Sequence, residues 1–170
     1  MAGVLGLGGL DVTDSLFDLP APTAVIARPA GLRILVTGSR DWPDTGLGAL
    51  PIHRAIHAAA LKLAPDPALW DVDGWMPQWP MITLVHGGAR GFDAIAARCG
   101  KHLGMVVDPH RPDYDRHGDR APLVRNQEMV DLGAGVCVAG PIGDRWSRTR
   151  HCMKAAAKAG IPIVEVSPQN

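Results

Sequence analysis

Short apolar runs alternate with longer segments of helical spacing from residue 31 onward. Strands that are apolar throughout and alternate with helices indicate a parallel sheet covered on both faces. The sequence therefore predicts an α/β protein with a Rossmann-like, doubly wound parallel sheet of about five or more strands and helices on both faces. Five runs predict buried strands: LRILVTG (32–38), MITLVHGG (81–88), MVVDPH (105–110), AGVCVAG (134–140) and IPIVEV (161–166). Four segments predict helices: 47–64, 92–104, 122–133 and 151–160.

Two segments break this alternation. Residues 1–30 are rich in Gly, Ala and Pro, and we interpret them as an N-terminal arm or flexible extension ahead of a domain at 31–170, with a partner-contacting segment as the alternative. Residues 65–80 contain four prolines and three tryptophans. They predict a long ordered loop whose indoles pack onto the domain or contact another subunit. The polar segments 111–121 and 141–150 are also expected to be loops.

The charge of the chain is balanced overall, but its arginines are concentrated. Lys and Arg together number 17, as do Asp and Glu, which argues against nonspecific nucleic-acid binding because that function rests on a basic surface. The segments that follow the predicted strands should meet at the crevice where such sheets bind ligands. They contain nine arginines: Arg40, Arg90, Arg111, Arg116, Arg120, Arg125, Arg145, Arg148 and Arg150. Guanidinium groups bind phosphate through paired charge-assisted bonds, so this concentration predicts an anionic ligand.

Glycines accompany the arginines in two of these segments. Gly38 follows the first predicted strand, and Gly87, Gly88 and Gly91 follow the second. They either let the backbone approach a phosphate at a helix N-terminus or simply form tight turns between strand and helix. The G-x-G-x-x-G fingerprint does not follow the first strand, and G-K-[ST] is absent, which disfavours a standard NAD dehydrogenase and a P-loop ATPase.

Two side chains in the predicted crevice each allow two interpretations. Asp93, at the start of a predicted helix, either complements the helix dipole or accepts a hydrogen bond from a ribose hydroxyl or from Arg90. Tyr114, the one tyrosine of the chain, either stacks on a base or packs within its loop. Both residues are therefore candidates for ligand binding.

Further candidates lie near the later predicted helices. Asn126, beside Arg125, either reads a base edge or caps a local turn. Arg148 and Thr149 precede the last predicted helix, where they are candidates to hold a second phosphate. The histidines near strand ends are interpreted as hydrogen-bonding residues rather than catalytic bases.

Four motifs, in order along the chain, resemble those of one family: ILVTGSRDW, VHGGARGFDAIAA, YDRHGDRAPLVRNQEMV and SRTRHCMKAAAKAGIPIVEV. Over residues 32–166 the chain resembles the YspA-like family of the SLOG superfamily, the Rossmann-like proteins grouped with DprA and the LOG phosphoribohydrolases. The resemblance implies a nucleotide or nucleotide-derived ligand, held by the G-S-R turn, the G-G-x-x-G turn and the segment before the last helix. The matching residues here are Gly38, Ser39, Arg40, Gly87, Gly88, Ala89, Arg90, Gly91, Asp93, Arg148 and Thr149, while Arg125, Asn126 and Met129 match the family's R-N-x-x-M signature.

One departure from the relatives bears on catalysis. The LOG enzymes carry P-G-G-x-G-T-x-x-E, whose glutamate takes part in cleaving a nucleoside monophosphate. Counted from Thr149, the corresponding position here is Cys152. A thiol does not replace a carboxylate in stabilising an oxocarbenium ion or activating water. Asp93 and Glu128 are the remaining candidates for a catalytic carboxylate.

Three functions follow as hypotheses. The first is a binding module that captures a nucleotide-derived, ADP-ribose-like signalling molecule as a sensor or sequestering protein. The second is a nucleotide N-glycosidase or LOG-type phosphoribohydrolase that uses Asp93 or Glu128. The third is DprA-like binding of single-stranded DNA, against which the neutral charge and the lack of an aromatic track count.

The remaining features concern environment and assembly. Three cysteines without C-x-x-C spacing, and histidines without H-E-x-x-H, predict neither a disulfide framework nor a metal site and favour a reducing compartment. Without an apolar run of about 18 residues or a basic leader, we expect a cytoplasmic protein with no membrane contact. We assign no cofactor beyond the nucleotide-derived ligand. A homodimer or higher oligomer is expected because SLOG relatives self-associate, with residues 1–30 and the tryptophan-rich insert as contacts.

Overall fold

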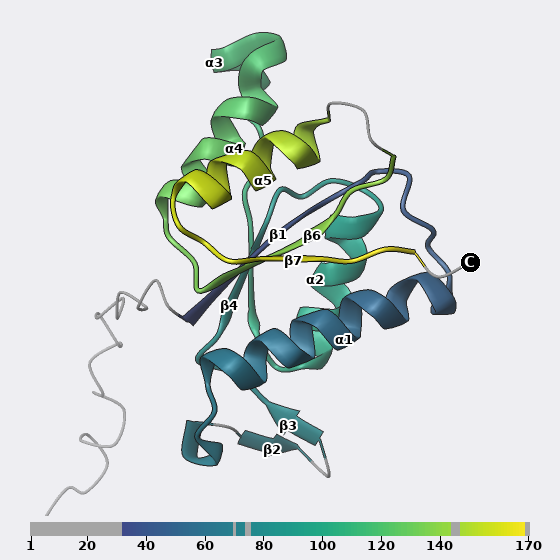
Figure 1. Cartoon of the computed structure of the whole chain (residues 1–170), viewed down its shortest axis with the longest axis vertical. Coiled ribbons are helices and arrows are strands. Elements are labelled where there is room, and N and C mark those ends of the chain that lie inside the picture. The colour runs from purple at the N-terminus through teal and green to yellow at the C-terminus, as the bar shows by residue number, and fades with distance from the viewer. Residues whose placement is uncertain (1–31, 70, 74–75, 144–146, 169–170) are drawn as a thin grey trace, which may run out of the picture.

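The strand β1 (Arg33–Gly38) lies in the middle of a five-stranded parallel sheet (Figure 1). The computed structural model describes residues 32–69, 71–73, 76–143 and 147–168. The sheet has the order β5-β4-β1-β6-β7, with β4 at Thr83–His86, β5 at Val106–Pro109, β6 at Val136–Gly140 and β7 at Ile163–Glu165. All four pairings are parallel, which confirms the predicted fold class. From β1 the chain adds β4 and then β5 on one side of the sheet. It then crosses to the other side of β1, where it adds β6 and β7, so the strand order reverses between β1 and β6.

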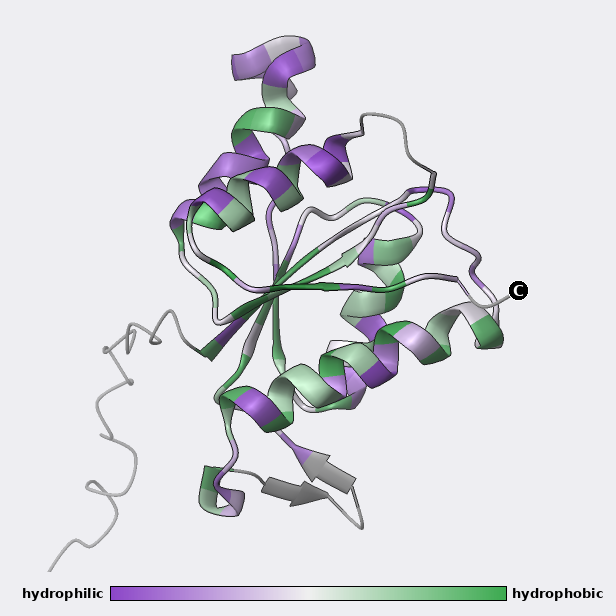
Figure 2. Ribbon diagram, viewed as in Figure 1, coloured by the Kyte–Doolittle hydropathy of each residue, from purple (hydrophilic) through white to green (hydrophobic). Residues whose placement is uncertain are grey.

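Helices cover both faces of this sheet. The helices α1 (Gly46–Leu63) and α2 (Phe92–His102) pack on one face, and α4 (Ala121–Asp131) and α5 (Arg148–Lys158) pack on the other (Figure 1). Successive side chains of a strand point to opposite faces. Accordingly, Ile34 and Val36 of β1 join the core beneath α1 and α2, while Leu35 joins the core beneath α4 and α5. Figure 2 shows the result as largely hydrophobic central strands flanked by helices of mixed character.

The insert at 65–80 contains regular structure rather than the predicted loop. It holds a 3₁₀ turn, η2 (Pro67–Leu69), and an antiparallel hairpin of β2 (Asp71–Asp73) and β3 (Met76–Gln78). Trp79, just after the hairpin, is fully buried in the core, and its backbone N–H donates to the Leu103 carbonyl at 2.9 Å. The insert is thereby fixed to the end of α2. The predictions for Trp70, Trp75 and residues 1–30 fall outside the described residues.

Side-chain caps explain two further differences from the prediction. The segment 111–121 was expected to be a loop but contains α3 (Tyr114–His117) and η3 (Gly118–Arg120), which project at the top of Figure 1. Asp113 caps α3 by accepting a hydrogen bond from the Arg116 backbone N–H at 3.0 Å. In the same way, α5 begins at Arg148 instead of 151, because the Ser147 hydroxyl accepts from the Arg150 N–H at 3.2 Å.

The aromatic ring of Phe92 fixes the ends of the two central strands. This buried ring packs edge-to-face on Trp42, with 4.8 Å between the ring centroids and an angle of 80°. A Cβ atom at either Gly38 or Gly140 would overlap the Phe92 ring. Glycine is therefore required at the carboxyl ends of β1 and β6 by packing inside the protein.

This packing makes Gly140→Ala a destabilising substitution. The added methyl group meets Phe92 and Trp42 in a filled core, so we expect the free energy of unfolding to fall by about 1 to 3 kcal/mol. Gly46→Ala is the matched control, because no atom lies within 4 Å of a Cβ added there, and it should change stability by under about 1 kcal/mol. Urea denaturation of both variants measures the difference. Equal stability of the two variants would contradict the packing role of Gly140.

Candidate ligand-binding site

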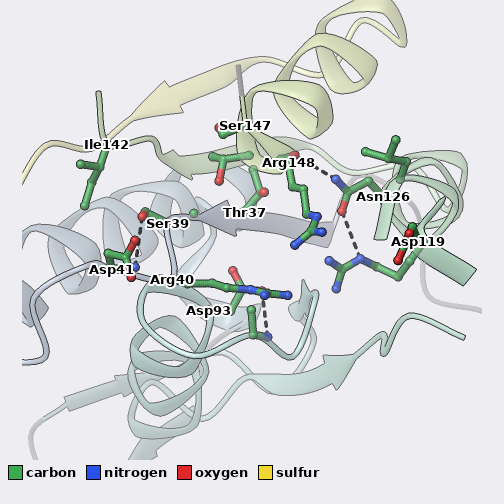
Figure 3. A pocket seen from close by; sticks show the side chains of 15 residues that line it. Thr37, Ser39, Arg40, Asp41, Asp93, Asp119, Asn126, Ile142, Ser147 and Arg148 are labelled. Atoms are coloured by element: carbon green, nitrogen blue, oxygen red, sulfur yellow. Dashed lines mark hydrogen bonds between the residues drawn. The ribbon is translucent and has the colours of Figure 1, made fainter. Parts of the chain in front are cut away.

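A cavity of about 400 Å³ lies at the carboxyl ends of β1 and β6, where the strand order reverses (Figure 3). Pockets for small ligands usually measure roughly 300 to 1,000 Å³. The lining residues come from the end of β1 and the segment after it, the loop after β4 and the first turn of α2, η3 and α4, and the loop after β6 with the first turn of α5. They are Thr37, Gly38, Ser39, Arg40, Asp41, Ala89, Asp93, Asp119, Leu123, Arg125, Asn126, Ile142, Ser147, Arg148 and Thr149.

The structure gathers most of the predicted ligand-binding residues at this cavity. Those that line it are Gly38, Ser39, Arg40, Ala89, Asp93, Arg125, Asn126, Arg148 and Thr149. Gly87, Gly88, Arg90, Gly91 and Tyr114 do not line it. The side chain of Tyr114 is half exposed, and that of Glu128 is exposed on α4 and also lies outside the lining. The structure thus brings one of the two candidate catalytic carboxylates, Asp93, to the cavity.

The buried pair Arg125 and Asn126 holds the segments around the cavity together. The Arg125 guanidinium donates to the carbonyl of Gly87, and also to the His110 carbonyl at 3.0 Å. Its Nε donates to Asn126 Oδ1 at 3.1 Å, and Asn126 Nδ2 donates to the Arg148 carbonyl at 2.9 Å. Two adjacent residues of α4 therefore join the ends of β4 and β5 to the first turn of α5.

The glycines after β4 are required by neighbouring protein groups. A Cβ at Gly87 would overlap the Arg125 guanidinium. Gly91 has φ 70°, and a Cβ there would lie 2.5 Å and 2.6 Å from the carbonyl oxygens of Arg40 and Ser39. Gly88 also has a positive φ of 66°. These three positions form the tight turn from β4 into α2, the alternative that the sequence left open.

Asp93 is a buried carboxyl group at the floor of the cavity. The backbone N–H of Ala89 donates to its Oδ2 at 3.3 Å. Burial raises the pKa of Asp93 to about 6, and hydrogen bonds from the backbone at Ala89, Gly87 and Gly38 and the charge of Arg125 only partly offset that rise. The group therefore titrates just below neutral pH.

Arg90 does not orient Asp93, as one interpretation of the sequence suggested. Its guanidinium pairs with Asp41 at 3.1 Å, and both side chains are more than three-quarters exposed. An ion pair so exposed contributes little to stability because water screens it. Among the arginines it is instead the buried Arg125 whose charge lowers the pKa of Asp93.

Two exposed arginines supply the positive charge inside the cavity. Figure 3 shows the side chains of Arg40 and Arg148 reaching into the same space from the ends of β1 and the start of α5. Arg148 lies in the first turn of α5, which has no acidic residue. A helix N-terminus carries a partial positive charge and normally favours acidic side chains. Basic residues there raise the local potential and favour a bound anion.

Six lining residues were not predicted from the sequence: Thr37, Asp41, Asp119, Leu123, Ile142 and Ser147. Asp41 follows the G-S-R turn directly, and Ser147 is the N-cap of α5, so adjacency to predicted residues could have indicated both. Asp119 reaches the cavity because residues 118–120 form η3. Ile142 and Leu123 add apolar surface that no chemical motif marks.

Cys152, which the resemblance places at the position of the LOG glutamate, is fully buried and does not line the cavity. Burial raises the pKa of its thiol to about 11, and a hydrogen bond with the Thr37 side chain works against that rise. The thiol is therefore protonated near neutral pH. It presents neither a charge nor an exposed nucleophile to a ligand.

The described residues contain neither a candidate metal site nor a helix suited to a membrane. His53 and His57 lie one turn apart on α1. Nowhere in the described residues, however, do three His, Cys, Asp or Glu side chains converge so as to hold a metal ion. No helix within the described ranges is long and apolar enough to cross a membrane.

Comparison with known proteins agrees with the resemblance. Residues 32–117 match the family model described as "YspA, cpYpsA-related SLOG family". The chain is also 40% identical to the "Gene 61 protein" of Mycobacterium phage D29 over 141 residues, which cover 78% of this chain and 94% of that protein. No solved structure matches the chain.

The hydrogen bonds of Arg125 predict a large effect of its removal on stability. Arg125→Met leaves the buried Gly87 carbonyl and the partly buried His110 carbonyl without this donor, and we expect a loss of about 2 to 4 kcal/mol in the free energy of unfolding. Arg90→Ala, which removes an exposed ion pair, should change it by less than about 0.5 kcal/mol. Chemical denaturation at pH 8 measures both. An Arg125→Met protein as stable as the Arg90→Ala control would refute this role.

The raised pKa of Asp93 predicts a pH-dependent stability. The native state holds this proton more tightly than the unfolded chain, so the stability that the neutral carboxyl contributes is present below about pH 4 and lost as pH rises to about 6. Relative to Asp93→Asn, the wild type should therefore lose roughly 2 to 3 kcal/mol between pH 4 and pH 7.5. Urea denaturation across this range isolates the contribution of Asp93. A pH-independent difference between the two proteins would show that the carboxyl group is not perturbed.

Proposed function

Because the chain belongs to the YspA, cpYpsA-related SLOG family, whose members are associated with nucleotide-related ligands, we propose that it binds a nucleotide derivative of the ADP-ribose class. It acts in this proposal as a sensor or sequestering protein. The observation that carries the proposal is the convergence of two exposed guanidinium groups, those of Arg40 and Arg148, on one cavity at the strand-order reversal, where the buried Arg125 also lines the wall.

The layout of the cavity suits a ligand with a charged middle and two polar ends. In Figure 3, Arg40 and Arg148 occupy the middle, with Ile142 and Asp41 toward one end and Asp119 toward the other. Leu123 also lines the cavity, one helical turn before Asn126 on α4. One end thus combines an apolar side chain with a carboxylate, and the other presents the carboxylate of Asp119. A diphosphate between two sugar or base moieties matches this order, since ribose hydroxyls and amino groups donate to carboxylates.

The balance of charge favours few phosphates over many. Three arginines and three aspartates are among the described lining residues: Arg40, Arg125 and Arg148, and Asp41, Asp93 and Asp119. Arg125 is already engaged by backbone carbonyls, which leaves two guanidinium groups for a ligand. Two guanidinium forks match a diphosphate, and a triphosphate would bring further negative charge toward the aspartates.

One observation supports hydrolysis as a second candidate function. Asp93 is a buried carboxyl at the cavity with a pKa of about 6, a value suited to general acid–base chemistry. The hydrogen bond from Ala89 and the burial of the group instead suit a structural carboxyl, and the position of the LOG glutamate is a buried cysteine. We therefore place binding ahead of hydrolysis.

Binding is tested by calorimetry with the full chain. ADP-ribose should bind more tightly than AMP or ribose 5-phosphate, because each of these fills one end of the cavity. Arg40→Ala and Arg148→Ala should each raise the dissociation constant about 10- to 100-fold, since each removes charge-assisted bonds to the diphosphate. Arg54→Ala is the control, an exposed arginine of α1 outside the lining. Equal effects of all three substitutions, or no binding by any of these ligands, would reject the proposal.

Hydrolysis is tested by chromatography of free base released from nucleoside monophosphates and from ADP-ribose. We expect no release above that of a buffer blank. Release that disappears in Asp93→Asn but persists in Glu128→Gln would establish the enzyme instead, because Asp93 lines the cavity and Glu128 does not.

A further inference from the structure

A second cavity, of about 340 Å³, lies between α1 and α2 and shares no residue with the ligand site. Its lining is mainly apolar and includes Ala49 and Leu50 of α1 together with Ile95 and Cys99 of α2. Leu50 is exposed at this cavity, and Leu47 and Leu61 are two further exposed leucines of α1. We call this surface the α1–α2 groove.

The two helices that form the α1–α2 groove carry an excess of positive charge, and one of their cations, Arg98, lines the cavity. The helix α1 has no acidic residue, and the one acidic residue of α2, Asp93, lines the ligand cavity instead. Exposed cations on the two helices are Arg54, Lys62, Arg98 and Lys101. Asp44, which precedes α1, pairs with Arg98, so three of these cations have no acidic partner on either helix. The groove therefore suits an apolar segment that carries negative charge.

We propose that residues 11–19 of the same chain, DVTDSLFDL, occupy the α1–α2 groove. This segment carries Asp11, Asp14 and Asp18, and no lysine or arginine precedes Arg28. Its charge is thus opposite to that of the groove. A second copy of the α1–α2 face would instead oppose like charges, which disfavours that occupant.

The order of residues within 11–19 fits recognition by a groove. Val12, Leu16 and Leu19 have the i, i+4, i+7 spacing of one helical face, and the three aspartates have the i, i+3, i+7 spacing of a neighbouring face. An amphipathic segment of this kind lays its apolar face into a groove between helices. In this arrangement the aspartates lie toward Arg98 and the other exposed cations of α1 and α2.

The connecting chain is long enough for docking within one molecule. Residues 20–31 link the segment to the start of β1, and twelve residues extend over at most about 40 Å. The 18-residue helix α1 is about 27 Å long. The tether therefore exceeds the length of the helix that forms one wall of the groove.

Disulfide trapping in the full chain tests the proposal. Cysteines are introduced as Leu16→Cys with Leu50→Cys, and the matched control pairs Leu16→Cys with Leu132→Cys on the opposite helix layer. Leu50 and Leu132 are equally exposed, at 39% and 38%. Under mild oxidation at low micromolar protein, the first pair should form an intramolecular disulfide at least about tenfold faster, because docking raises the effective concentration of the two thiols. Mass spectrometry of proteolytic peptides identifies the bonded pair.

A third variant tests the electrostatic part of the proposal. Adding Asp11→Asn, Asp14→Asn and Asp18→Asn to the first pair should slow trapping by at least about threefold, as should 0.5 M salt, because the attraction is screened. Equal trapping rates at the two positions would overturn the proposal. So would a disulfide formed mainly between two molecules, since it would place the segment on a neighbouring copy.

Discussion

The candidate site depends on one buried cation, the guanidinium of Arg125. A charge taken out of water must be matched by hydrogen bonds, and Arg125 finds its acceptors in the carbonyls of Gly87 and His110 and in Asn126. Asn126 in turn donates a hydrogen bond to the Arg148 carbonyl at the start of α5. The loops that surround the cavity are thus held by protein groups, and the cavity is formed before a ligand binds.

Near Arg125, two helices have charged residues in their first turns that are unfavourable for the stability of the protein. Basic residues lie in the first turn of α5, where the helix dipole disfavours them, and a carboxyl group is buried in the first turn of α2. Local conflicts of this kind concentrate at functional sites, because a ligand resolves them. An anion between Arg40 and Arg148 would do so for α5. The cavity therefore combines walls held in place by hydrogen bonds with positive charge, at Arg40 and Arg148, that a bound anion would neutralise.

The sheet and most of the site could be predicted from the sequence because both rest on local signals. Apolar runs such as 32–38 and 134–140 mark buried strands, and topology then brings their carboxyl ends together. Sequence alone does not decide which arginines turn inward. Arg40 and Arg148 do, whereas Arg90 lies outside the lining and pairs with Asp41, a choice set by three-dimensional packing.

The glycines illustrate a second limit of sequence reasoning. A glycine that admits a phosphate and one that admits a side chain look the same in a sequence. Here Gly38 and Gly87 leave room for Phe92 and for the Arg125 guanidinium. The apolar lining residues Leu123 and Ile142 belong to no recognisable motif. The hairpin in the insert at 65–80 is not evident from the sequence, because Pro77 and three tryptophans interrupt any strand pattern there. Long-range contacts, rather than local propensity, decide each of these cases.

A crystal structure of the protein with ADP-ribose would test the central claim most directly. We predict the diphosphate between the guanidinium groups of Arg40 and Arg148 at the first turn of α5, with the hydrogen bonds of Arg125 to Gly87 and His110 unchanged. The account would be contradicted by a ligand bound outside this cavity, or by an Arg125 side chain that leaves these carbonyls to contact the phosphate.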